Sequence, residues 1–326
     1  MMADAVFVTD YMKLGIMQKE IPEIKADEVL IKTMACGLCC WDSWLYRGVN
    51  VPGPMPYAIG HEGAGIVEKV GSLVDNVKVG DKVFAASGSN EMMVEYFVNK
   101  ADGVVKLPDD TTDWAAVIYE PTCCMVNLLN ITKIRMGDHV VMVGAGYMGL
   151  LALQGLTNAS QAGRITVFEL REDRRKMAQV INPEIEVLDP ESKEGKDIIQ
   201  EIQDKGGADV CIDLGASDNG FHLADSMTKE AGKLVIGSFH RGEVTFDGTK
   251  WHLGGLNVYN LAPMSNPHYT EVLPRTLTMI EKGVFNPASL VSHTAYYKDV
   301  EELENMFQRS CDKEDGYMKG VILFAK

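Results

Sequence analysis

Short runs of alternating hydrophobic and polar residues fill the first hundred positions of this 326-residue chain. The runs are rich in β-branched and aromatic residues and are separated by glycine turns, a pattern typical of strands. We expect strands at residues 28–33, 65–70, 81–85 and 93–98. This part of the chain is therefore predicted to form a β-rich, barrel-like unit.

The pattern changes further along the chain. Between residue 138 and about residue 261, apolar runs of strand length alternate with segments of helical spacing. We expect strands at 139–143, 164–169, 208–213, 233–236 and 256–260, and helices at 112–129, 148–157, 171–180 and 195–205. Continuous apolar strands between helices indicate an α/β unit with a parallel sheet covered on both faces. Helices at 268–282 and 300–310 and a strand at 320–324 follow, and this tail could complete the first unit rather than the second.

The charge balance restricts the class of partner. The chain has 46 acidic against 31 basic residues, a formal net charge of −15, and no run rich in lysine or arginine. Nucleic acid and anionic membrane surfaces are therefore not expected as partners.

Cysteine usage and the apolar stretches indicate where the protein resides. The seven cysteines include two adjacent pairs, 39–40 and 123–124, and lack the spacing of a disulfide framework. The start has no basic segment followed by an apolar core, so we expect no signal peptide. The most apolar long stretch, 140–156, contains four glycines and a glutamine, so we expect no membrane span. These features favour the cytoplasm.

A glycine-rich loop follows the predicted strand at 139–143. Gly144 allows a tight turn, Gly146 lets backbone amides approach a pyrophosphate, and Gly149 permits close packing of helix on strand. A strand, then three glycines at this spacing, then a helix is the pattern of a dinucleotide site. Tyr147 and Met148 complete the loop of this predicted site. The alternative is a buried strand–turn–helix with no ligand.

The end of the next predicted strand bears on which dinucleotide binds. Glu169 lies twenty residues after Gly149, where a carboxylate can accept hydrogen bonds from ribose hydroxyls and repel a 2′-phosphate. This favours NAD over NADP. Arginines follow closely, among them Arg174, which we include among the residues that bind the cofactor.

Candidate metal ligands are scattered over the first 120 residues. Cys36 and Cys39 have the spacing of a redox pair, but strands surround them and no helix is expected to follow, so the usual βαβ setting is missing. Cys36 also suits plain packing. The chain offers a thiolate at Cys39, an imidazole at His61 and carboxylates at Glu62 and Glu120, the last of which opens a predicted helix. This donor set suits a catalytic zinc ion with an open fourth position.

Four ordered motifs resemble the zinc-dependent medium-chain dehydrogenase/reductase superfamily, and most closely its sorbitol (polyol) and threonine dehydrogenase branch. They are Cys-Gly-Leu-Cys39 with Asp42, Gly60-His-Glu-Gly-Ala-Gly65, Glu120-Pro121 and the Gly144–Gly149 loop. The resemblance implies a GroES-like catalytic domain formed by residues 1–118 and 262–326. A Rossmann domain at 119–261 would lie between these two segments, with the active site in the cleft.

The resemblance also implies roles for individual residues. Cys39 and His61 match metal ligands, and Glu62 or Glu120 would complete the ligand set with water. Asp42 matches a family position whose side chain does not bind the metal but orients the histidine ligand or fixes the local backbone. Many relatives hold a structural zinc ion in a lobe with four cysteines, but residues 85–93 contain none, so we expect one catalytic zinc and no structural zinc.

The proton route departs from the family pattern. Alcohol dehydrogenases of this superfamily place Ser or Thr two residues after the ligand cysteine, where this chain has Trp41. An indole N–H does not act as a general acid or base. Ser43, Tyr46, a metal-bound water, Glu62 and Glu120 remain candidates for the relay, and Trp41 could instead stack on a sugar face or line an apolar pocket.

These features together predict a zinc-dependent, NAD-linked oxidoreductase that interconverts a small secondary alcohol, such as a polyol, sugar or cyclitol derivative, with its ketone. One alternative is an enzyme that reduces a C=C or C=N bond and needs no hydroxyl relay. Another is a catalytically silent nucleotide-binding protein. The resemblance further implies a homodimer or homotetramer.

Overall fold

The computed structural model describes residues 1–86, 91–262 and 269–325. The chain divides into two compact units. Unit 1 contains Met1–Pro121, Thr270–Thr278 and Asn286–Lys326, and unit 2 contains Thr122–Tyr269 and Met279–Phe285. The C-terminal tail thus returns largely to the first unit, while residues 279–285 belong to the second.

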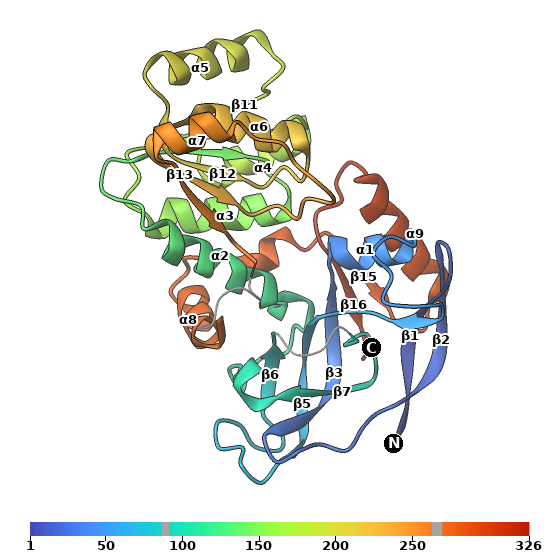
Figure 1. Ribbon diagram of the computed structural model, residues 1–326. Helices are drawn as coiled ribbons and strands as arrows, with labels where there is room; N and C mark the ends of the chain where they lie inside the picture. The colour runs from blue at the N-terminus through green and yellow to red at the C-terminus, as the bar shows by residue number, and fades with distance from the viewer. Residues whose placement is uncertain (87–90, 263–268, 326) are drawn as a thin grey trace. The chain divides into compact units, whose positions relative to one another are not determined.

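The described part of unit 1 is built on two sheets (Figure 1). Its strands are β1 (Met2–Asp10), β2 (Lys13–Glu20), β3 (Glu28–Leu38), β4 (Tyr57–Ala58), β5 (Glu62–Val70), β6 (Lys82–Ala85), β7 (Tyr96–Lys100), β8 (Val104–Lys106), β15 (His293–Tyr296) and β16 (Gly320–Leu323). One sheet has the order β2-β1-β4. The other has the order β15-β16-β3-β5-β6-β8, and β7 also pairs with β3.

The long strand β3 determines which distant segments of unit 1 meet. It runs antiparallel to β5 on one side, where Gly37 pairs with Glu62, and antiparallel to β16 on the other, where Leu38 pairs with Gly320. The end of β3 therefore lies between the start of β5 and the start of β16.

Helices α1 (Cys40–Tyr46) and α9 (Val300–Asp312) pack against each other in unit 1. Helix α9 buries Leu303, Met306 and Phe307, whose spacing places them on one helical face. The ring of Tyr46 lies 5.1 Å from that of Phe307 in an edge-on arrangement. Tyr46 is only 3% exposed, so this ring belongs to the core.

Unit 2 is a doubly wound α/β unit. Its strands are β9 (His139–Val143), β10 (Arg164–Phe168), β11 (Glu186–Leu188), β12 (Ala208–Asp213), β13 (Thr228–Ile236) and β14 (Asn257–Asn260). Its helices are α2 (Glu120–Thr132, whose first two residues are in unit 1), α3 (Tyr147–Ala159), α4 (Glu172–Ile181), α5 (Lys193–Asp204), α6 (Asp218–Met227) and α7 (Gly248–Gly254), and α8 (Tyr269–Glu281) is divided between the units.

The strands described in unit 2 form one parallel sheet, in the order β11-β10-β9-β12-β13-β14. Helices α3 and α6 cover opposite faces of this sheet (Figure 1). The order reverses beside the first strand, β9, as in dinucleotide-binding folds. The predicted α/β class with a β-rich unit and a Rossmann-type sheet is therefore confirmed.

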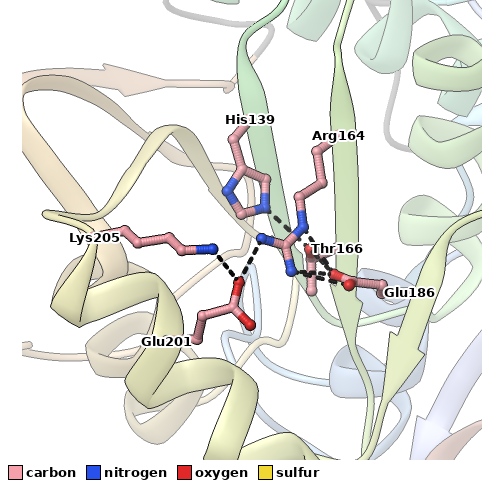
Figure 2. A network of polar contacts seen from close by, with 6 residues as sticks. All are labelled: His139, Arg164, Thr166, Glu186, Glu201 and Lys205. Carbon is pink, nitrogen blue, oxygen red and sulfur yellow. Dashed lines mark hydrogen bonds and ion pairs between the residues drawn. The ribbon is translucent and has the colours of Figure 1, made fainter.

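A polar network fixes the edge strand β11 to β10 (Figure 2). The Arg164 guanidinium donates to both carboxylate oxygens of Glu186, at 2.7–3.0 Å, and to Glu201 of α5 at 3.1 Å. Nε2 of His139 lies 3.0 Å from the hydroxyl oxygen of Thr166. Because Glu186 lies on β11 and Arg164 on β10, the ion pair ties the two strands together.

Three expected elements differ in the structure. Residues 112–119 do not continue the helix; a 3-10 turn covers Ala115–Val117, and α2 starts at Glu120, which places Pro121 in the first turn, where its missing N–H costs no hydrogen bond within the helix. The expected strand at 93–98 lies at Tyr96–Lys100, since Met93 and Val94 pair with β1 instead. The expected helix at 268–282 starts at a residue outside the described ones, and α8 begins at Tyr269.

A helix also follows Cys39, where none was expected, and its cause is given below. Among the described residues, no helix combines the length and apolar character that crossing a bilayer requires.

Candidate functional site

Cys39 lies at the junction between β3 and α1. The Asp42 carboxylate, which is completely buried, accepts the Cys39 backbone N–H at 3.1 Å and so caps the start of α1. Its other oxygen accepts the Gly60 N–H at 3.0 Å and lies 3.8 Å from Nδ1 of His61. One buried carboxylate thus ties the segment that carries Cys39 to the segment that carries His61.

Three of the predicted ligands come together. One donor atom each from Cys39, His61 and Glu62 lies within 4.8 Å of the other two. Ligand atoms around a tetrahedral zinc ion, with bonds of about 2.0–2.3 Å, are separated by about 3.3–3.8 Å, so small adjustments would suffice. A thiolate, an imidazole and a carboxylate at this separation fit a catalytic zinc ion.

The protonation of the cluster agrees with this fit. The hydrogen bond from Cys40, whose Sγ lies 4.0 Å from Sγ of Cys39, holds the pKa of the Cys39 thiol well below its usual range, and the nearby His61 acts in the same direction. Burial opposes a charge on His61, but the negative charges of Asp42 and Cys39 raise its pKa well above the ordinary value. The cluster therefore attracts positive charge, as a metal site does.

Glu62 has a buried cationic partner that the sequence did not indicate. The Lys319 ammonium donates to Oε2 of Glu62 and, at 3.1 Å, to the backbone oxygen of Leu38. Glu62 is 2% exposed and Lys319 3%. Burial raises the pKa of Glu62 to about 7, the Lys319 charge opposes this rise, and Glu120 adds to it.

The space that Glu62 occupies exists because residue 37 is glycine. A Cβ atom on Gly37 would lie 2.0 Å from Oε2 of Glu62 and 2.6 Å from Cγ2 of Ile118. Any side chain at this position would displace the carboxylate.

The other predicted residues of this site are not part of the donor cluster among the described residues. Glu120 starts α2, and within the described residues it does not join the cluster of three donors. Trp41 is half-buried, with its ring 6.2 Å from that of Trp44 in an edge-on arrangement. The Ser43 hydroxyl, 3% exposed, lies 2.8 Å from the hydroxyl of Ser310 in α9. Ser43 is thus engaged with α9, which disfavours it as a relay to solvent.

In unit 2 the glycine loop has the geometry that its residues suggest. Gly144 has φ of +100°, and a Cβ there would lie 2.5 Å from the backbone oxygen of Leu214. A Cβ on Gly149 would lie 2.3 Å from the backbone oxygen of Gly144. Gly146 precedes α3, whose first two residues are Tyr147 and Met148. The N-terminus of a helix that follows a glycine loop can accept a phosphate through its backbone amides.

Glu169 and Arg174 lie at this loop. Oε2 of Glu169 accepts the backbone N–H of Ala145 at 2.7 Å, and Oε1 accepts that of Arg171 at 3.0 Å. The guanidinium of Arg174 lies 3.5 Å from the position of a Cβ on Gly146. An anionic and a cationic side chain therefore flank the glycine loop.

Comparisons with known proteins agree with both units. Residues 25–109 match the family model of the alcohol dehydrogenase GroES-like domain, and residues 148–278 match that of the zinc-binding dehydrogenase. The chain is 27% identical to (R,R)-butanediol dehydrogenase of Bacillus subtilis, over 87% of this chain and 89% of the relative. It is 25% identical to D-arabinitol dehydrogenase 1 of Uromyces fabae, over 92% of each.

The structure resembles that of an alcohol dehydrogenase from Escherichia coli CFT073 solved with NADH, with a TM-score of 0.82, 22% identity and 99% of both chains covered. At that identity the likeness concerns the fold. Taken with the family matches, the fold and the donor cluster define a class: the chain belongs to the zinc-type medium-chain alcohol dehydrogenase family. It is an oxidoreductase, which argues against a catalytically silent nucleotide-binding protein.

Proposed function

We propose that this protein is a zinc-dependent, NAD(H)-linked dehydrogenase that interconverts a small secondary alcohol, such as a polyol or diol, with its ketone. The gathering of Cys39, His61 and Glu62 donors within 4.8 Å carries this proposal. The named activities of the relatives, on butanediol and arabinitol, support the substrate class.

The proposed metal site has one ion, two fixed protein ligands and a third, Glu62, that can exchange. Zinc, when bound, would polarise the C–O bond of the alcohol and stabilise the alkoxide. Cys39 and His61 would hold the ion, and Glu62 would complete or exchange with the open position. Asp42 orients both ligand-bearing segments through its hydrogen bonds to Cys39 and Gly60.

The proposed dinucleotide is NAD. The helix start at Gly146 would take the pyrophosphate, with Arg174 as an added cation. The Glu169 carboxylate, anchored by the Ala145 amide, would repel the 2′-phosphate of NADP. We also propose a homodimer or homotetramer.

A panel of polyols, diols and simple secondary alcohols with NAD⁺ or NADP⁺, before and after removal of metal by a chelator, tests this function. We expect turnover with NAD⁺, a loss of on the order of a hundredfold or more without metal, and recovery on addition of zinc. Cys39→Ser should lose both metal and turnover, whereas Cys40→Ser, a change at the adjacent exposed cysteine, should keep its metal.

Other results would contradict the proposal in different ways. Turnover that survives complete metal removal would refute zinc dependence. Reduction of enones but not of ketones with NADH would favour the C=C reductase instead.

A further inference from the structure

The buried Lys319 is a charged group beside the proposed metal site for which neither the sequence motifs nor the proposed chemistry provides a role. It reaches the site from the residue before β16, across the end of β3. An ammonium group that is 3% exposed has lost its hydration and needs compensation from its neighbours. This compensation includes the Glu62 carboxylate and the carbonyl oxygen of Leu38.

The geometry makes Glu62 a shared group. Its carboxylate belongs to the cluster of donors formed with Cys39 and His61, and one of its oxygens accepts the hydrogen bond from Lys319. A carboxylate whose charge is balanced by an adjacent ammonium is a weaker ligand for a cation. The ammonium also repels a divalent ion bound beside it.

The surroundings hold Glu62 in this shared position. The absence of a side chain at Gly37 provides the space for its carboxylate, and the pairing of Gly37 with Glu62 across β3 and β5 fixes its backbone. Leu38, the next residue of β3, pairs with Gly320 and offers its carbonyl oxygen to Lys319. Both partners of the ion pair are thus positioned by the same strand.

We propose that Lys319 is a positioning residue that competes with the metal for Glu62 and keeps one coordination position of the ion open. This inference rests on the proposed zinc site. Its consequence is that the protein binds its metal less tightly than the three donors alone would allow. The coordination position left open would then be available to a substrate oxygen.

Three variants test the inference. Lys319→Met removes the competing charge, Lys319→Arg keeps it, and the double variant Glu62→Gln/Lys319→Met removes both charges. The double variant also guards against misfolding, because it leaves no buried charge of this pair without a partner. Each protein is loaded with zinc, and its affinity is measured by competition with a chromophoric chelator. Each is then loaded with cobalt, and its visible spectrum is recorded.

We expect Lys319→Met to bind zinc on the order of tenfold or more tightly than the wild type, because a nearby positive charge is lost and Glu62 is released to the metal. The cobalt bands, which depend on the number and type of ligands, should shift in Lys319→Met and return to their wild-type position in Lys319→Arg. In the Glu62→Gln background, Lys319→Met should change the cobalt spectrum little.

Unchanged or weaker zinc binding in Lys319→Met, with a wild-type cobalt spectrum, would overturn the inference and leave the proposed function standing. An equally shifted spectrum in the presence and absence of the Glu62 carboxylate would also overturn it. A wild-type protein that binds neither zinc nor cobalt would refute the metal site itself, and this inference with it.

Discussion

Replacement of Gly37 by alanine tests how the fold accommodates Glu62. The added Cβ would lie 2.0 Å from Oε2 of Glu62 and 2.6 Å from Ile118, well inside van der Waals contact. The φ angle of Gly37 is not in the left-handed region, so the backbone itself tolerates alanine. Any loss of stability therefore comes from the displaced carboxylate and its ion pair with Lys319.

The expected cost has two parts. An extra methyl group in a closely packed interior costs about 1–3 kcal/mol. Breaking a buried ion pair costs about 3–5 kcal/mol, but here the pair is displaced rather than deleted, so only part of this applies. We expect a loss of about 3 kcal/mol, equivalent to roughly a hundredfold change in the unfolding equilibrium.

Urea unfolding followed by tryptophan fluorescence measures this loss. Three of the four tryptophans, at 41, 44 and 114, belong to unit 1, so the signal reports mainly the unit that contains Gly37. The matched control is Gly53→Ala, in which the new Cβ has no neighbour within 4 Å, and its stability should be unchanged or slightly raised. A Gly37→Ala protein as stable as this control would refute the placement of the Glu62 carboxylate opposite residue 37.

Two further predictions concern unit 2. Arg164→Met should lower the unfolding free energy by about 1–2 kcal/mol, a modest loss because the ion pairs with Glu186 and Glu201 are only partly shielded from water. Arg164→Lys should restore only part of this stability. Equal urea midpoints for the wild type and both variants would contradict the prediction. For Asp209, burial raises the pKa, but the ion pair with Lys229 and the hydrogen bond from the His139 backbone N–H outweigh this, so its folded-state pKa lies below the ordinary 3.8. Such a carboxylate stabilises the fold above its unfolded-state pKa, and this contribution is lost as the pH falls through its folded-state pKa. The stability difference between the wild type and Asp209→Asn should thus be present at about pH 7 and shrink as the pH falls below the ordinary pKa of 3.8, and a difference that does not depend on pH would count against it.

Local motifs were sufficient to predict much of the fold and of the candidate site. The loop from Gly144 to Gly149 encodes its own turn, since the positive φ and the close backbone contacts each require glycine at a fixed spacing. Cys39 and Asp42, three residues apart, also make a local contact, and it closes the first turn of α1. The sequence does not signal this short helix, because its N-cap residue is Cys39, a residue type that is not typical of helix starts, and the cap depends on Asp42 three residues later.

Other errors came from features that periodicity does not report. The apolar pattern over 112–129 suggested one helix, but Pro121 restricts where a helix can begin. The run at 93–98 has strand character throughout, yet its first residues pair with β1 and its later ones with β3. Pattern alone identified a strand and left its partner undetermined.

The sequence by itself determined the glycine loop and the alternation of strands and helices in unit 2, because both depend on residues within a short stretch of chain. The candidate ligands at 39, 61 and 62 come from separate motifs and are named through the family resemblance. Only the tertiary structure decided that Glu62 shares its carboxylate with Lys319, 257 residues away, and that Ser43 meets Ser310. These contacts depend on the register of β5, β3 and β16 and on the packing of α1 against α9. Strand register and helix packing are collective results of burying the whole core, so no single stretch of sequence specifies them.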